Sequence, residues 1–217
     1  VVVTEGVGCC GALNHHIGKD NIARDLAKTN IDAWLTEFDQ RGIDNIIVNA
    51  AGCGTEIKDY AYMFKDDPEY NEKAKKISNL TKDISELLSE HQLPSASLSN
   101  QPSIIYHDAC SLMHGQGITR EPREHLKAVG FELAEIPGRH FCCGSAGSYN
   151  LLQPAMAETL KDHRLTLIDK VPKSNRTSIL ATGNIGCLMQ LASGTGLQVV
   201  HTVELLDWAT GGLKPLK

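Results

Sequence analysis

Seven cysteines dominate the chemistry that this 217-residue chain can offer. Four thiolates in one place would suit a Cys₄ iron–sulfur cluster or a tetrahedral zinc ion. An odd number of cysteines that includes two adjacent pairs is a poor disulfide framework, because neighbouring residues do not easily reach the disulfide dihedral angle. The second half contains four candidates for one centre: Cys110, Cys142, Cys143 and Cys187.

The first half offers a smaller set of ligands. It has three cysteines, and an imidazole from a nearby histidine could complete a zinc site with three sulfurs and one nitrogen. Its metal-ligand candidates are Cys9, Cys10, Cys53, His15 and His16. A lone cysteine is often only a small buried hydrophobic residue, and a loop histidine is more often a hydrogen-bonding residue than a ligand. The repeated cysteine pairs therefore carry more of the prediction than the histidines do.

The cysteines belong to an internal duplication. Both adjacent pairs precede a glycine, and each is followed at a similar distance by a Gly-Cys pair. From Cys10 to Cys53 is 43 positions, and from Cys143 to Cys187 is 44. Two copies of one unit are therefore expected, offset by 133 or 134 residues.

The elements between the cysteines follow an alternating pattern. Short apolar runs that lead into the Gly-Cys pairs predict buried strands over 46–48 and 179–181, and further strands are expected over 104–106, 131–136 and 197–200. Helices are predicted over 22–42, 122–130 and 156–167, and another from Asp67-Pro68 with an apolar face of Ile77, Leu80, Ile84 and Leu87. The sequence predicts an α/β fold of two pseudo-repeated halves, with largely parallel sheets flanked by helices. Ligand loops would then share one sheet edge.

The two halves are not equally complete. Cys110 lies 32 positions before Cys142, and its counterpart in the first half would fall upstream of Val1. We therefore expect a first half that is incomplete at its N-terminal side. The stretch Gln92 to Ser103 is rich in Ser and Pro and predicts a linker, which gives half-domains over 1–93 and 94–217.

Composition limits the classes of partner and the compartment. The net charge of −5 and the scattered Lys and Arg residues give no basic stripe, so nucleic acid is not an expected partner. No run of 18 apolar residues predicts a membrane helix, and the first residues lack the basic region of a signal peptide. The expected location is the cytoplasm. Among weaker signals, Asp108 is expected to cap a helix or to orient His107, with capping favoured.

Together the cysteine runs resemble those of the cysteine-rich, or CCG, domain family, with glycolate oxidase iron–sulfur subunits as the most similar group. The resemblance covers nearly the whole chain. Its carriers are residues 8–16, 49–54, 106–110, 142–154 and 183–187.

The resemblance implies an electron-transfer subunit with an iron–sulfur cluster, of the 4Fe–4S type, on the four cysteines of the second half. It implies partners with flavin that oxidise glycolate to glyoxylate, a quinone or membrane acceptor, and a location that extends to the surface of the inner membrane. Members of this group also carry a ferredoxin-like domain, whose cysteine runs are missing from this sequence. Related heterodisulfide reductases use a fifth cysteine three positions after Cys187, where this chain has Gln190.

Two alternatives remain open from the sequence. The domains could be a zinc-bound or metal-free scaffold that docks the flavin subunit. They could also reduce disulfides through Cys142 and Cys143, as the heterodisulfide reductase relatives suggest.

Overall fold

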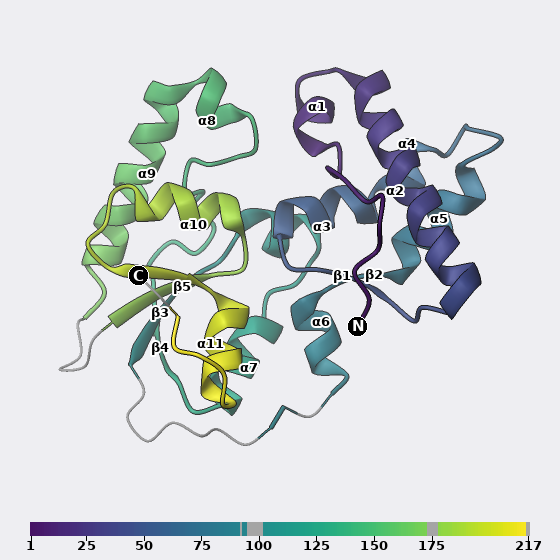
Figure 1. Cartoon of the computed structure of the whole chain (residues 1–217). Coiled ribbons are helices and arrows are strands. Elements are labelled where there is room, and N and C mark those ends of the chain that lie inside the picture. The colour runs from purple at the N-terminus through teal and green to yellow at the C-terminus, as the bar shows by residue number, and fades with distance from the viewer. Residues whose placement is uncertain (92, 95–101, 173–177, 216–217) are drawn as a thin grey trace.

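Two parallel sheets organise the chain (Figure 1). The computed structural model describes residues 1–91, 93–94, 102–172 and 178–215. The first sheet pairs β1 (Ile46–Val48) with β2 (Thr81–Asp83). The second has the order β4-β3-β5-β6, with β3 at Ser103–His107, β4 at Glu132–Glu135, β5 at Ser178–Thr182 and β6 at Gln198–His201. All pairings are parallel, so the predicted α/β class is confirmed.

Helices flank both sheets. Those of the first half are α1 (Ala12–His16), α2 (Asp20–Arg41), α3 (Ala51–Lys58), α4 (Tyr60–Met63), α5 (Asn71–Leu80) and α6 (Ile84–Ser89). Those of the second half are the π-helix η1 (Ser111–Gly115), α7 (Glu121–Ala128), α8 (Tyr149–Leu152), α9 (Pro154–Asp169), α10 (Ile185–Ala192) and α11 (Thr202–Ala209).

The single helix predicted from Asp67-Pro68 through Leu87 is wrong. Helix α5 begins at Asn71 and ends at Leu80, and the next three residues form β2. The side chain of Asp83 accepts from the N–H of Ser85, and Glu86 completes a capping box. This cap starts α6 as a separate helix. The apolar residues Ile77, Leu80, Ile84 and Leu87 keep helical spacing although they belong to two helices. The spacing alone did not predict the strand β2 between them.

The duplication is visible in the backbone. Helices α2 and α9 begin 134 residues apart, as do α3 and α10. Gly11 and Gly144 have φ angles of 91° and 89°. A β-carbon on Gly11 would lie 2.9 Å from the carbonyl oxygen of Ala23, and one on Gly144 would lie 2.3 Å from that of Ala157. In both copies, the glycine after the cysteine pair thus lets the chain pass against a helix.

Replacing Gly144 with alanine is expected to destabilise the fold. A non-glycine residue at positive φ costs about 1–3 kcal/mol, and the new β-carbon would overlap the α9 backbone. Urea unfolding followed by circular dichroism measures the loss. Gly196→Ala is the control, because that glycine is exposed and has no atom within 4 Å of an added β-carbon. Equal unfolding midpoints for the two variants would contradict the steric argument.

The copies also differ. Strand β1 corresponds to β5, because they lead into the equivalent helices α3 and α10. Strand β2 corresponds to β6 in the same way, since they lead into α6 and α11. The described residues of the first half contain no counterpart of β3 or β4. Of the predicted linker, only Leu93, Pro94, Pro102 and Ser103 lie within the described residues, and Ser103 already belongs to β3. The division into 1–93 and 94–217 stays a prediction.

The halves share a bonded interface. The hydroxyl of Thr55 donates to the carbonyl oxygen of Ser111 (3.1 Å), and the amide of Gln116 donates to that of Ala51 (3.0 Å). Ala51 is buried in a core cluster of the second half, and Leu88 of α6 packs against another. The first half therefore contributes side chains to the core of the second.

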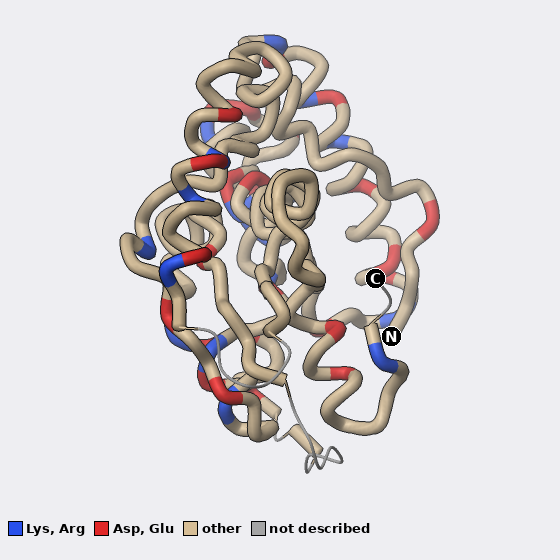
Figure 2. Tube along the Cα trace, turned by 90° about the vertical axis from the view of Figure 1, so that its left-hand side faces the viewer, with Lys and Arg blue, Asp and Glu red and all other residues tan. Residues whose placement is uncertain are grey.

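Figure 2 shows the positions of charged residues along the Cα trace, where Lys and Arg are interspersed with Asp and Glu. None of the described helices combines the length and the hydropathy needed to cross a bilayer.

Candidate metal centre

The cysteines of the second half follow the carboxyl ends of three neighbouring parallel strands. Cys110 comes three residues after β3, the pair Cys142-Cys143 lies in the loop after β4, and Cys187 is the third residue of α10, which follows β5. Because β3 lies between β4 and β5, the three loops meet at one edge of the sheet. This is the placement that the sequence predicted.

The four thiols form a continuous series of contacts. Cys142 is near enough to both Cys110 and Cys143 for their pKa values to depend on one another, and the same holds for Cys143 and Cys187. Sharing of hydrogen bonds with Cys110 and Cys143 lowers the pKa of Cys142 far below its ordinary value, and contact with Cys143 lowers that of Cys187. The same contacts, together with burial, raise the pKa of Cys110 and of Cys143. The four predicted cysteines are thus neighbours, while the close group of ligand atoms among the described residues is formed by His107, Cys143 and Cys187. That all four cysteines hold one centre stays a prediction.

Backbone and amide groups support negative charge on these sulfurs. The N–H of Gly144 donates to Sγ of Cys142 (3.3 Å), and Nδ2 of Asn184 donates to Sγ of Cys187 (3.4 Å). Cys187 also lies in the first turn of α10, where unpaired amides and the helix dipole favour an anion. Cys143 and Cys187 are buried, whereas Cys110 and Cys142 are half-buried. The site is therefore closed on one side and reaches solvent on the other.

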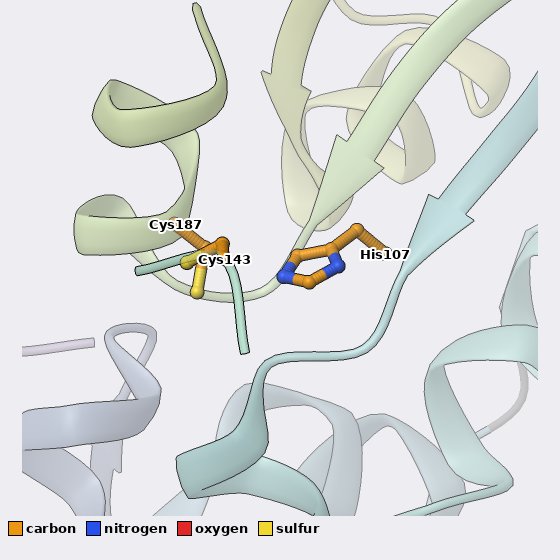
Figure 3. Close-up of side chains that lie close together, drawn as sticks. All are labelled: His107, Cys143 and Cys187. Atoms are coloured by element: carbon orange, nitrogen blue, oxygen red, sulfur yellow. The ribbon is translucent and has the colours of Figure 1, made fainter. Parts of the chain in front are cut away.

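His107 lies in the site, although the sequence analysis did not include it among the metal-ligand candidates. Its ring lies beside Cys143 and Cys187, and one ligand atom from each of the three residues lies within 4.8 Å of the others. Figure 3 shows one ring nitrogen of His107 facing the two sulfur atoms. His107 is the last residue of β3 and is 1% exposed. Its position at the carboxyl end of a buried strand was the signal that could have found it.

The donor set fits the metal groups that the sequence suggested. Four thiols, two of them with a lowered pKa, are the soft ligands of an iron–sulfur cluster or of tetrahedral zinc. Gln190, which stands where a fifth cysteine would be needed, lies with its amide Nε2 3.5 Å from the carbonyl oxygen of Ala157. The arrangement supports a four-cysteine centre.

The first half is organised differently. Cys10 contacts Cys53, which lowers the pKa of Cys53 to about 7 and raises that of Cys10, while Cys9 is exposed. Nδ1 of His15 lies 2.8 Å from Oε1 of the buried Glu56. Within the described parts of the chain, the only close group of three metal-binding side chains is the one in the second half. A zinc ion in the first half stays a prediction.

The ring of His16 lies across the interface between the halves. A β-carbon on Gly147, in the loop of the second cysteine pair, would come within 2.7 Å of its Nδ1. The loop after one cysteine pair thus lies against the helix after the other. His16 therefore lies at the contact between the two halves, and its role as a metal ligand stays a prediction.

Asp108 has neither of the roles predicted for it. It caps no helix, since the residue before η1 is Cys110 and no side chain caps that end. Its carboxylate instead pairs with Arg123, through both terminal nitrogens, and with Arg139 at 3.3 Å. Burial alone would raise the pKa of Asp108, but the hydrogen bonds and charges of these arginines lower it. The pair ties the loop before Cys110 to α7.

Comparisons with known proteins agree with this geometry. Residues 1–58 and 104–192 match the family described as cysteine-rich domain, CCG. The chain is 34% identical over 209 residues to the glycolate oxidase iron–sulfur subunit of Escherichia coli K12, covering 96% of this chain and 50% of that protein. It is 35% identical over 222 residues to the probable glycolate oxidase iron–sulfur subunit of Bacillus subtilis 168 (97% and 48%).

A third relative is a subunit of a different oxidoreductase. The chain is 31% identical over 212 residues to one of the subunits of the fumarate reductase (CoM/CoB) from Methanothermobacter marburgensis, covering 96% of this chain and 40% of that protein. The chain thus spans about half the length, or less, of these three relatives.

Proposed function

The chain belongs to the cysteine-rich (CCG) domain family, and on that premise we propose that it is an iron–sulfur electron-transfer unit of an oxidoreductase complex. The observation that carries the proposal is the gathering of four cysteines in the loops after three neighbouring parallel strands, at one sheet edge. Cys110, Cys142, Cys143 and Cys187 would hold the cluster. A 4Fe–4S cluster bound there would accept and release one electron at a time.

Several residues prepare the site for that role. The amide of Gly144 and the side chain of Asn184 stabilise thiolates that would otherwise be costly to bury. The burial of Cys143 and Cys187 excludes water from one side of the centre. Cys110 and Cys142 keep the other side near the surface, where an electron donor or acceptor can approach.

The complex proposed is a glycolate oxidase. The names of two relatives, at 34% and 35% identity, support this choice. Oxidation of glycolate to glyoxylate releases two electrons and two protons, which a flavin subunit would take before the electrons pass singly through this chain towards a quinone. Large apolar side chains are exposed on the two helices next to the cysteines, as interfaces often require: Tyr149, Leu151, Leu152, Ile185 and Met189.

Metal analysis tests the proposal. Protein purified without oxygen is expected to contain about four iron atoms and four acid-labile sulfides per chain, directly or after reconstitution. Iron, sulfide and zinc are measured in the same sample. A chain that takes up no iron after reconstitution would overturn the assignment.

Zinc is the second candidate, because the same four thiols form a tetrahedral zinc site equally well in chemical terms. Colourless protein with one zinc per chain that survives reconstitution would favour a docking scaffold. The third candidate, disulfide reduction, receives support from the lowered pKa of Cys142 beside Cys143. Rapid alkylation of Cys142 near neutral pH in metal-free protein, with turnover of a disulfide substrate, would favour it.

A further inference from the structure

Arg164 places a buried positive charge behind the cysteines. Its side chain projects from α9 and is fully buried. Nε donates to Nδ1 of His107 (3.0 Å), and Nη1 donates to the carbonyl oxygen of Gly138 (2.8 Å). Nη2 is buried without a hydrogen-bond partner in the described structure. Burial lowers the pKa of Arg164, but arginine keeps its proton in proteins. The charge therefore persists next to the site.

This contact decides where the imidazole carries its proton. The N–H of Arg164 points at Nδ1 of His107, so Nδ1 must present its lone pair. A neutral ring then has its hydrogen on Nε2. Nε2 is buried without a partner among the described residues, and the nitrogen that faces Cys143 and Cys187 in Figure 3 is the one that Arg164 does not occupy. A metal ligand would need a lone pair on that same nitrogen.

The first half supplies a natural comparison. Asn30 lies 134 positions before Arg164, at the same place on the corresponding helix, and is equally buried. Its Nδ2 donates to the carbonyl oxygen of Cys9 (3.0 Å), so Asn30 bonds to the loop of the first cysteine pair through a neutral side chain. Where the second half has the neutral Gln190, the first half has Glu56, whose buried carboxylate bonds to His15. Of the two copies, the second thus has a buried cation at this position and the first does not.

We infer that Arg164 and His107 act as a positioning pair. Arg164 holds the imidazole of His107 with Nε2–H directed at the cysteine sulfurs, and its positive charge stabilises the thiolates. His107 is therefore a hydrogen-bond donor to the centre and not a metal ligand. The inference rests on the proposed metal centre and adds to it the residues that set its charge. The pair is also one of the differences between the two copies, since the first has Asn30 at the position of Arg164 and no described counterpart of β3, the strand that carries His107.

The tautomer of His107 is a direct test that needs no metal. Long-range ¹H–¹⁵N correlation spectra of the reduced, metal-free chain with ¹⁵N-labelled histidine distinguish the two protonation patterns of each ring. His107, assigned by its loss in His107→Gln, is expected as the Nε2–H form with an unprotonated Nδ1. The Nδ1–H form would overturn the inference.

The counter-charge is tested with Co²⁺ as a probe for thiolates, under reducing, oxygen-free conditions. Arg164→Gln is expected to weaken Co²⁺ binding by about 10- to 100-fold, as loss of an outer partner of a metal site does. Arg164→Lys, which keeps the charge, is expected to recover part of the affinity. Lys161→Gln is the matched control: it removes a buried cation one turn away on α9 that bonds Glu158 and Ser193. Equal affinities for Arg164→Gln and Lys161→Gln would contradict the role of Arg164.

The distinction between donor and ligand is tested on iron. In His107→Gln, an amide N–H can replace Nε2–H, so the iron content is expected to stay at the level of the unchanged chain. His107→Leu is expected to keep iron but to lower the midpoint potential, because the reduced cluster loses a hydrogen bond. Loss of iron in both variants would identify His107 as a ligand.

These measurements separate the inference from the proposed function. If the unchanged chain takes up no iron, the electron-transfer proposal fails, while the tautomer and the Co²⁺ affinities still decide the role of the pair. If the chain takes up iron and Arg164→Gln binds Co²⁺ as tightly as the unchanged chain, the inference fails and the proposed function stands.

Discussion

Serine in place of Cys143 is expected to abolish iron incorporation, whereas serine in place of Cys10 is expected to leave it unchanged. The two residues occupy the same position in the two copies, and both are buried. Cys143 contacts Cys142 and Cys187, so its sulfur joins the series of four. Cys10 contacts Cys53 in the half that has Asn30 in place of the buried arginine. Iron and sulfide per chain after anaerobic reconstitution measure the difference.

The design controls for the serine itself. Both changes replace a buried thiol with a hydroxyl in an equivalent loop, so any general loss of folding affects both, and circular dichroism reports it. Iron lost equally from the two variants would mean that the halves share one centre. Iron retained in Cys143→Ser would remove that residue from the ligand set.

Asp108→Asn is expected to cost about 3 kcal/mol of unfolding free energy at neutral pH, the lower end for breaking a buried ion pair. Arg123 would lose its bidentate carboxylate and keep the half-exposed Glu135 (3.2 Å) and the carbonyl oxygen of Thr119 (3.3 Å). The arginines lower the pKa of Asp108 in the folded state. Its stabilisation is therefore present above the unfolded pKa of about 3.9 and is lost as the pH falls through the folded pKa.

Urea unfolding at several pH values measures both effects. The difference between the unchanged chain and Asp108→Asn is expected to be constant at neutral pH and to shrink below about pH 4. Glu132→Gln is the control, because that carboxylate is on the exposed side of β4 and is absent from the ion pairs of the described residues. A difference that does not change with acid would show that the asparagine acts through packing and not through charge.

The spacing of the cysteines predicted most of the fold and the meeting of the cysteine loops of the second half at one sheet edge. It did so because a parallel sheet gathers the loops after its strands at one edge, so Cys110 and Cys187 meet although they are far apart in sequence. Helix α6 was missed as a separate element although the sequence carries its start signal: Asp83 and Glu86 are spaced as a capping box. The helical spacing of the apolar residues on both sides of this capping box led to the prediction of one continuous helix.

The pair behind the cysteines could not be predicted in the same way. Arg164 lies on a helix where charged residues are normally assigned to the solvent side, and only the packing of α9 against the loop at Gly138 reveals that it is buried. His107 was visible beside Cys110, but its role depends on which ring nitrogen Arg164 occupies. The contact joins two residues that are 57 positions apart in the sequence, so no local pattern predicts it.

Side chains of the first half pack into the core of the second, and this packing couples the folding of the two halves. Ala51 and Leu88 complete apolar clusters built mainly by the other half. The second half therefore cannot reach its final packing density until the first is present, and unfolding should proceed as one cooperative transition. Replacing the first half with an unrelated unit would therefore leave cavities in the core of the second, unless the new unit supplied side chains in place of Ala51 and Leu88.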